Sequence, residues 1–399
     1  MTTIRSMVVR GSIVSLFLLS LSVKAQKNST QQSEEQGLLP LKYNASKAFK
    51  PFIAAEAWGT YNMKEDSSDS ESDQRFDTSL RRLRFGASGT PYPWLKYVFQ
   101  FYADRLGEDD NAFTKGSYSG IGIWDAYISA KLLKNSDLLY LHAGYYWTAI
   151  SRQFNTSPWA VGSFDKTRAD WYLRYFIAGK GNGTESGFGL GGLKNYNNFG
   201  ISYRIGSYEP DAYTSSQYAD RLYTGRLMLS FGDPEQKQYK YMLSGNQWGK
   251  RRGITLGLGA ASQNNGQVDE NTYWNQSKAY GSDILINYDA WRIDGEYYRM
   301  KRTASNASDF EGSEFHVYVG YNIPFKETFI EPSFTYEKYK GEGNSDLFSK
   351  IGDDITYDIG ANWYLDGQRL KLSLHYVIQK GSISSALGNF MGTAIQIKL

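Results

Sequence analysis

The sequence has no cysteine, three histidines and nine prolines among 399 residues. Without cysteine the chain cannot form disulfides, thiolate zinc sites, iron–sulfur centres, a cysteine nucleophile or a lipidated N-terminal cysteine. The mean hydropathy is −0.51, and the one long apolar run lies at the N-terminus. A polytopic helical membrane protein needs repeated apolar runs of about 20 residues. These classes of protein are therefore excluded.

Aromatic residues and glycine are abundant instead. The chain holds 32 Tyr, 21 Phe, 10 Trp and 40 Gly, a combination that is unusual for a soluble enzyme of this size. This composition directs attention to sheet structures that expose apolar and aromatic side chains on one face.

Residues 1–25 have the pattern of a secretory signal peptide. Arg5 and Arg10 are basic, residues 11–23 are apolar, and Val23-Lys24-Ala25 forms a small-x-small cleavage site. An uncleaved membrane anchor is the alternative. Removing this segment takes three bases from the 44 Lys and Arg and leaves 41, equal to the 41 Asp and Glu. The formally neutral mature chain is not expected to bind nucleic acid.

Residues 26–50 are polar, rich in Gln and Ser, and lack periodicity. We interpret them as a flexible periplasmic N-terminal segment. Residues 51–399 form the third predicted unit, a transmembrane β-barrel domain.

The barrel prediction rests on alternation with a period of two. In residues 95–102, Leu95, Tyr97, Phe99 and Phe101 share one face, and residues 124–132 repeat the pattern. A soluble sandwich also alternates, but these segments run to about ten residues, the length that a tilted strand needs to cross a bilayer. No segment shows helical periodicity, so no helix is expected in this domain.

Sixteen segments fit such strands. They are residues 51–61, 80–89, 94–104, 121–132, 138–148, 184–193, 198–206, 221–231, 252–262, 279–288, 291–302, 313–322, 328–338, 354–364, 369–379 and 389–399. Links after odd-numbered segments are long and those after even-numbered segments are mostly short, as in outer-membrane barrels with long extracellular loops and short periplasmic turns. The link 232–251 follows an even-numbered segment but is long, so it breaks this pattern. A hidden strand pair at Tyr239–Leu243 would raise the count to eighteen.

Three motifs resemble the phosphate-selective porin O and P family. They are LRRLRFGASG at residues 80–89, DAYI at 125–128 with LHAG at 141–144, and ANWYLDGQRLKL at 361–372. The resemblance covers residues from about 50 to 399. It implies an all-β antiparallel up-and-down barrel of sixteen strands, a homotrimer, an inward third long loop and a pore lined by Arg and Lys.

Projecting the alternation predicts which cations face the pore. The candidate pore-lining and selectivity residues are Arg82, Arg84, Lys96, Lys131, Arg204 and Arg226. Arg82 and Arg84 are the first candidates for selectivity, because an arginine row in a confined pore attracts anions and orders phosphate. The alternative is that paired charges brace the barrel wall, and the neutral net charge argues against strong anion selectivity.

The longest link, residues 149–183, follows the fifth segment, where the inward loop is expected. Its basic candidates are Arg152, Lys166, Arg168 and Arg174, and its aromatic residues Phe154, Trp159 and Phe164 could pack it against the wall. A surface loop is the alternative.

The sequence thus predicts a porin in the outer membrane of a Gram-negative bacterium. It would pass small hydrophilic solutes and ions, with anions such as phosphate as candidates, while contacting membrane lipid and lipopolysaccharide. No catalytic residue, cofactor or metal site is expected, because the histidines at 142, 316 and 375 show no ligand spacing. The alternatives are a lipid hydrolase that uses His142 or His375 with a nearby serine, and a non-conducting adhesion or assembly barrel.

Overall fold

The computed structural model describes residues 43–64, 73–106, 120–148, 150–210, 220–267, 273–305, 307–383 and 388–399. The expected signal peptide and most of the expected N-terminal segment lie outside these ranges. Within them, no helix is both long and apolar enough to span a membrane.

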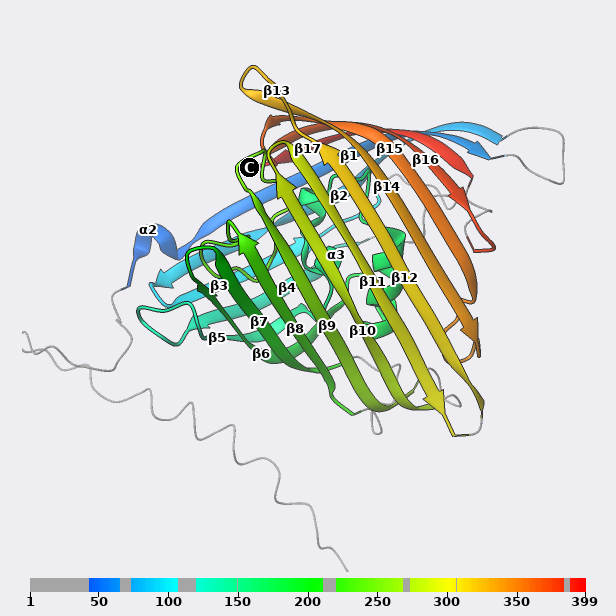
Figure 1. The fold of residues 1–399 in the computed structure, drawn as a ribbon, viewed down its shortest axis with the longest axis horizontal. Helices are drawn as coiled ribbons and strands as arrows, with labels where there is room; N and C mark the ends of the chain where they lie inside the picture. Colours follow the sequence, from blue (N-terminus) through cyan, green and yellow to red (C-terminus); the bar gives the residue numbers. More distant parts are fainter. Residues whose placement is uncertain are drawn as a thin grey trace, which may run out of the picture. The chain divides into compact units, whose positions relative to one another are not determined.

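One antiparallel sheet closes on itself (Figure 1). Each strand pairs with its neighbours in the chain, and the last strand pairs with the first, from Ala54 opposite Lys398 to Met63 opposite Asn389. A short strand, β13, continues β12 along the same partner strand, β14. Counting β12 and β13 as one barrel strand gives a barrel of sixteen strands. Closure matters in a bilayer because lipid offers no partner for the free backbone groups of a sheet edge.

The strands are β1 (Lys50–Lys64), β2 (Asp73–Tyr92), β3 (Leu95–Tyr102), β4 (Gly122–Lys131), β5 (Tyr140–Trp147), β6 (Thr184–Asn195), β7 (Phe199–Glu209), β8 (Leu222–Gly232), β9 (Gly253–Gln267), β10 (Tyr273–Tyr288), β11 (Trp291–Ala304), β12 (Ala307–Tyr321), β13 (Ile323–Phe325), β14 (Thr328–Gly343), β15 (Gly352–Asp366), β16 (Leu370–Lys380) and β17 (Asn389–Lys398). A short helix, α2 (Ala45–Ala48), precedes β1.

All sixteen predicted segments lie in strands of this barrel, and the predicted sixteen-strand fold class is confirmed. The alternative of eighteen is wrong, because residues 239–243 form no strand pair and instead enter the lumen. Several strands are longer than predicted. The expected loop 303–312 is mostly β11 and β12, which continue the ladder to Ala304 opposite Ala307.

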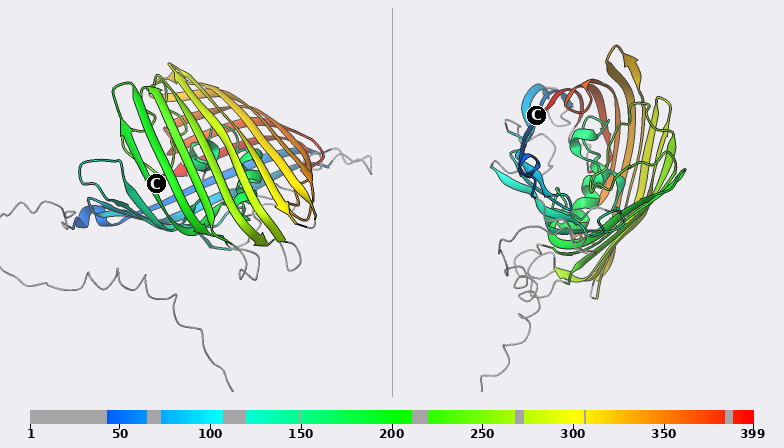
Figure 2. Two further views of the ribbon diagram at one scale, coloured as in Figure 1. Left: turned by 60° about the horizontal axis from the view of Figure 1, so that its bottom comes forward. Right: turned by 90° about the vertical axis from the view of Figure 1, so that its left-hand side faces the viewer.

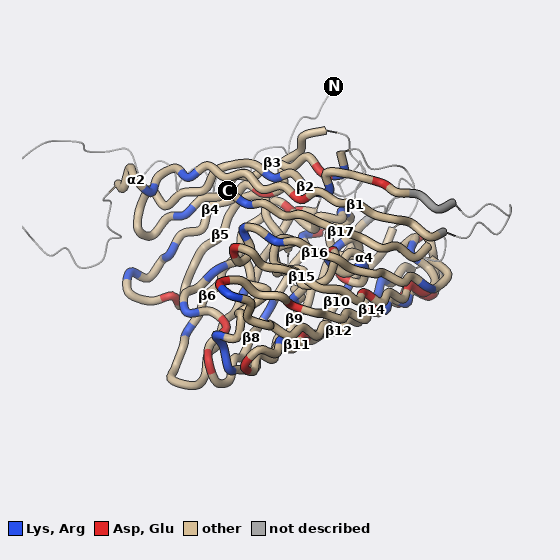
Figure 3. The backbone as a smooth tube through the Cα atoms, turned by 90° about the horizontal axis from the view of Figure 1, so that it is seen from above, with Lys and Arg blue, Asp and Glu red and all other residues tan. Residues whose placement is uncertain are grey.

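The two faces of the sheet differ as the alternation predicts. Apolar side chains on the outward face stay exposed, as in the apolar band of transmembrane barrels. They include Phe99, Ile128, Phe188, Ile205, Leu258, Phe315, Ile359, Leu374 and Ile395. Basic and acidic positions are interspersed along the strands (Figure 3).

The link between β5 and β6 folds into the barrel, and we call residues 148–183 the inward segment. It contains α3 (Arg152–Asn155), the 3₁₀ turn η2 (Pro158–Ala160) and α4 (Arg168–Ala178). The right-hand view of Figure 2 shows these green helices within the ring of strands. The expectation of no helix was therefore wrong. Periodicity missed α4 because most of its residues are buried and its half-buried face carries Trp171 and Tyr175, so the helix shows no polar stripe for solvent.

Candidate functional site: the constricted lumen

The inward segment is attached to the wall as soon as it leaves β5. The Ser151 hydroxyl donates to Glu296 on β11 over 3.0 Å, and the Gln153 backbone N–H donates to the same carboxylate over 2.9 Å. Ser151 also caps α3 by accepting from the backbone N–H of Phe154 at 3.1 Å. One serine thus ends the extended chain, starts the helix and anchors both to the barrel.

Arg152 connects this anchor to two other parts of the chain. Its guanidinium lies 2.7 Å from Glu235, in the link between β8 and β9, and 3.2 Å from Asp283 on β10. Arg226 on β8 also pairs with Asp283, at 2.6 Å, and all four side chains are buried. Burial alone would raise the pKa of Glu235, but Arg152 outweighs that effect and holds the pKa below its ordinary value.

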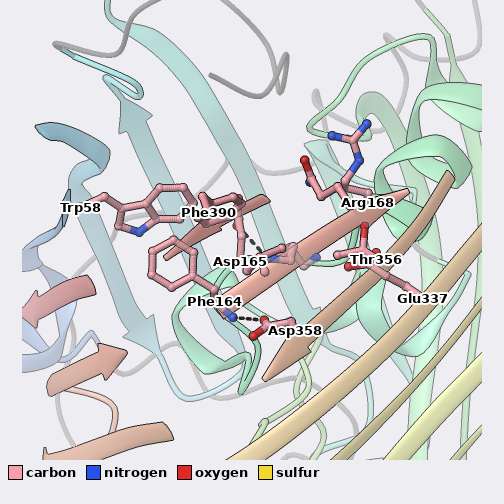
Figure 4. A pocket seen from close by; sticks show the side chains of 11 residues that line it. Trp58, Phe164, Asp165, Arg168, Glu337, Thr356, Asp358 and Phe390 are labelled. Atoms are coloured by element: carbon pink, nitrogen blue, oxygen red, sulfur yellow. Dashed lines mark hydrogen bonds between the residues drawn. The ribbon is translucent and has the colours of Figure 1, made fainter. Parts of the chain in front are cut away.

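The middle of the inward segment packs against the opposite wall. The ring centroid of Phe164 lies 4.4 Å from that of Trp58 and 5.7 Å from that of Phe390, and its backbone N–H donates to Asp358 over 2.6 Å. Figure 4 shows these side chains around a cavity of about 30 Å³. The middle of the inward segment is therefore packed onto the wall formed by β1, β15 and β17.

A β-bulge adds an arginine that simple alternation assigns to the lipid face. The register between β1 and β2 shifts after Glu56, and Arg81 has no partner residue on β1. Both Arg81 and Arg82 are consequently buried on the inner side, where both pair with Asp165 of the inward segment, and Arg82 also pairs with Glu56. Bulges re-aim side chains in this way. Sequence reasoning missed Arg81, since nothing in the local pattern marks the bulge.

Arg84 has a similar structural environment. It pairs with Asp104 and stacks over Trp124, with the guanidinium carbon 3.9 Å from the ring centroid, and only 1% of the residue is exposed. Arg82, Arg84 and Arg226 therefore all face the interior as projected, but carboxylates neutralise each of them. These contacts correspond to the bracing alternative.

The other projected lysines lie toward the end with the short links. Lys131 pairs with Asp137 in the next turn at 2.7 Å. Lys96 is exposed and has no carboxylate within 4.0 Å among the described residues; it interacts electrostatically with Lys240 and with Asp125.

Arg204 also lacks an acidic partner within the described part of the chain. It donates to Asn155 of the inward segment and, over 2.9 Å, to the backbone carbonyl of Lys240. The ring of Tyr241 lies 4.7 Å from its guanidinium carbon. Lys96, Arg204 and Lys240 thus form a basic group with Asp125 as its acidic neighbour, and we call these three cations the basic group below.

Helix α4 is fixed by contacts with β14 and β15. Arg168 lies 2.7 Å from Asp354, to which the Tyr172 hydroxyl donates over 2.6 Å, and the Ala169 N–H donates to Glu337 over 3.1 Å. Acidic wall residues therefore bind the positive N-terminal end of this helix.

Within the inward segment, Asp170 is the common partner of two cations. Lys166 lies 3.5 Å and Arg174 lies 3.0 Å from its carboxylate, and all three are buried. Burial disfavours the charged form and lowers the pKa of Lys166 to about 7, while the pair with Asp170 offsets only part of this effect. All four predicted basic residues of the link thus lie inside the barrel.

A second segment enters the lumen from the end with the short links. Residues 233–252, the β8–β9 link, reach the inward segment, where Leu243 donates from its backbone to Asn155 over 3.0 Å. A Cβ built on Gly245 would lie 1.7 Å from the carbonyl oxygen of Ala160, so only glycine permits this approach. The unusual length of this link was visible in the sequence, although we interpreted that length as a hidden strand pair and not as a segment inside the lumen.

The histidines of the hydrolase alternative, His142 and His375, have other partners in the described structure. His142 contacts the Tyr239 hydroxyl at 3.1 Å, and His375 lies 2.5 Å from Asp358, beneath Phe164. No serine hydroxyl of the described residues hydrogen-bonds to either ring. The arrangement carries no sign of the proposed nucleophile and base pair.

A closed, up-and-down antiparallel barrel whose lumen is narrowed by a folded-in link defines a porin. The family model "Phosphate-selective porin O and P" matches residues 55–399. The chain belongs to this family, and it is an outer-membrane porin of a Gram-negative bacterium.

Solved structures of outer-membrane proteins share this fold at low sequence identity. The anion-selective porin from Comamonas acidovorans has a TM-score of 0.53 at 13% identity, covering 88% of this chain and 99% of that one. OmpF of Salmonella typhi, solved with daunomycin, has a TM-score of 0.53 at 13% identity, covering 90% and 99%. A trimer form of OmpT from Vibrio cholerae has a TM-score of 0.51 at 12% identity, covering 88% and 100%. A comparison with curated proteins gave no match. Family and fold are those of a channel rather than an enzyme.

Proposed function

We propose that this porin passes small inorganic ions through a narrow passage and prefers anions, with phosphate as a candidate. The narrowness follows from the two links that meet in the lumen and from the burial of most wall side chains beside them. We expect the passage to exclude solutes of disaccharide size or larger. The loop thus sets the size limit and the inward charges set the ion preference.

The basic group carries the proposed preference. Arg82, Arg84, Arg152 and Arg226 are neutralised by carboxylates, whereas Lys96, Arg204 and Lys240 have no ion-paired carboxylate among the described residues. Positive charge without a counter-charge in a confined, partly dehydrated passage attracts anions and can donate hydrogen bonds to phosphate oxygens. Asp125 reduces this field but leaves it positive. We therefore assign selectivity to the basic group and bracing to the paired arginines.

Reversal potentials in planar bilayers under a KCl gradient test the assignment. We expect anion preference in the wild type and its loss when Lys96→Gln is combined with Lys240→Gln. Lys278→Gln is the matched control, because Lys278 is exposed on the outward face of β10. Cation preference in the wild type, or an unchanged reversal potential in the double variant, would refute the proposal. Phosphate added to KCl should reduce chloride current if it uses the same passage.

Size exclusion needs its own measurement. In liposome swelling assays we expect permeation by ions and failure of disaccharides. The variant for comparison is a deletion within the inward segment, which should admit the larger solutes. Rapid swelling of wild-type liposomes in a disaccharide would contradict the narrow passage. Folded protein without any current would instead support the non-conducting alternative.

We also propose a homotrimer, a cleaved N-terminal signal peptide, and contact of the outward apolar face with lipid and lipopolysaccharide. The flexible periplasmic segment predicted over residues 26–50 is proposed to end before α2 (Ala45–Ala48) and β1, which are ordered elements of the structure. The family resemblance and the trimer form of OmpT from Vibrio cholerae, a structural neighbour, support the trimer. Native mass spectrometry in detergent and N-terminal sequencing of the mature protein would test the assembly and the cleavage after Ala25.

A further inference from the structure

Three side chains on adjacent strands converge in the wall of the lumen. Glu296 on β11 lies opposite His316 on β12 in the ladder, and Glu314 lies two residues before His316 on the same face. One ligand atom from each of the three lies within 4.8 Å of the others, and all three side chains are buried. Two paired strands of a closed barrel hold these atoms, so the arrangement is pre-organised.

Glu314 is the least satisfied member. Its exposure is 0%, and neither carboxylate oxygen has a hydrogen-bond partner within the described part of the chain. The charged groups that act on it most strongly are all acids: Glu296, Asp170, Glu337 and Asp283. A buried carboxylate without a counter-charge is strongly unfavourable, so a cation or a proton must accompany it.

His316 presents one free ring nitrogen to the carboxylates. Its Nε2 lies 3.4 Å from Asp294 and 3.4 Å from the Gln153 amide. Its Nδ1 lies 3.7 Å from Glu296 and has no hydrogen-bond partner among the described residues. A histidine whose far nitrogen is held by a carboxylate while the near nitrogen is free is the arrangement found at metal ligands.

Nearby cations do not neutralise the cluster. Lys166 and Arg174 both pair with Asp170 of α4, while Arg292 pairs with Asp294 at 2.9 Å. Within the described residues, no Lys or Arg lies within 4.0 Å of the Glu296 or Glu314 carboxylate. Two carboxylates and one imidazole therefore remain for a cation.

From this geometry we propose that Glu296, Glu314 and His316 bind one divalent transition-metal ion, of which Zn²⁺ is the representative. An imidazole nitrogen favours Zn²⁺ and related ions over Ca²⁺ and Mg²⁺, which prefer oxygen-only sites. Water could complete the coordination. The spacing of the histidines along the sequence gave no sign of such a site, because the ligands come from two strands that only the barrel pairs.

The site would also fasten the inward segment. Glu296 accepts hydrogen bonds from Ser151 and Gln153. A metal ion on the other side of this carboxylate would fix its orientation and with it the start of the segment. Loss of the ion is then expected to increase current fluctuations in single-channel recordings.

Direct Zn²⁺ binding to the tag-free, detergent-solubilised barrel tests the site. After treatment with EDTA and dialysis, we expect calorimetry and elemental analysis to give one Zn²⁺ per chain. Glu314→Gln and His316→Gln should each weaken binding by at least about tenfold. Matched controls are Glu331→Gln and His142→Gln, which alter a buried lumen glutamate and histidine outside the cluster and should keep full binding. Heat-modifiable electrophoretic mobility checks that each variant is folded.

If the cluster variants fail to fold, anomalous diffraction at the zinc edge from wild-type crystals still locates the ion. Density between Glu314 and His316 would support the site. Failure of the wild type to bind Zn²⁺, binding retained in both cluster variants, an ion located elsewhere, or tighter binding of Ca²⁺ than of Zn²⁺ would each overturn the proposal. Failure to bind Zn²⁺ would mean that a proton accompanies Glu314, and it would leave the proposed ion preference untouched.

Discussion

Thr156 and Leu243 form an isolated parallel β-bridge inside the barrel, although they belong to links that enter from opposite ends. The bridge joins the inward segment to the β8–β9 link, and the buried pair of Arg152 with Glu235 reinforces it. The constriction is therefore built from two segments that support each other. Weakening either segment should therefore alter the constriction that the two segments form together.

Replacing Glu235 by Gln should destabilise this junction. Removing one partner of a buried ion pair costs about 3–5 kcal/mol, and we expect the lower end because Arg152 keeps Asp283 at 3.2 Å. Chemical denaturation and the noise of single-channel currents measure the effect. Asp289→Asn is the control, since its pair with Arg252 is largely exposed at 68% and 52% of the two side chains. Equal stability of the two variants would show that the junction contributes nothing.

Truncating Phe164 to alanine should release the middle of the inward segment. Loss of a buried phenylalanine costs about 3–5 kcal/mol, and Trp58 and Phe390 would lose their shared contact. We expect the barrel to stay folded and the conductance to rise. Phe325→Ala, at an exposed position of β13, should change neither quantity. An unaltered conductance in folded Phe164→Ala would mean that this packing does not restrict the passage.

The stability of the constricted state should depend on pH through Lys166. Its pKa of about 7 in the folded protein lies below the ordinary value of 10.5, so the unfolded state binds more protons between these two values. Stability therefore rises as the pH increases from about 7 toward 10, and the group adds no further pH dependence below 7.

Lys166→Met removes the titrating group and should abolish this rise in stability between about pH 7 and pH 10. Denaturation midpoints between pH 6 and pH 10, compared between the two proteins, provide the measurement. Parallel pH profiles of wild type and variant would contradict the assignment.

Arg82→Gln should alter stability more than ion preference. Arg82 is paired with both Glu56 and Asp165, so its charge is already compensated. Its loss leaves the buried Glu56 carboxylate without its ion-pair partner, whereas Asp165 keeps Arg81. Reversal potentials should stay close to the wild-type value while the denaturation midpoint falls. A large loss of anion preference with unchanged stability would restore Arg82 as a selectivity residue.

The sequence by itself determined the barrel. Alternation with a period of two over segments of about ten residues, with long and short links alternating, is sufficient to predict the fold. Every strand of a transmembrane barrel separates lipid from lumen, so its side chains must alternate between apolar and polar. The same rule placed Arg82, Arg84, Arg204 and Arg226 on the inner face.

Only the tertiary structure decided what those inner residues do. Arg81 enters the lumen through a bulge, α4 folds into the lumen with most of its residues buried, and the β8–β9 link folds inward. Pairing across the lumen then distinguishes braced arginines from the basic group. The convergence of Glu296, Glu314 and His316 likewise depends on strand register. These relationships join residues far apart in the chain, and local periodicity carries no information about such contacts.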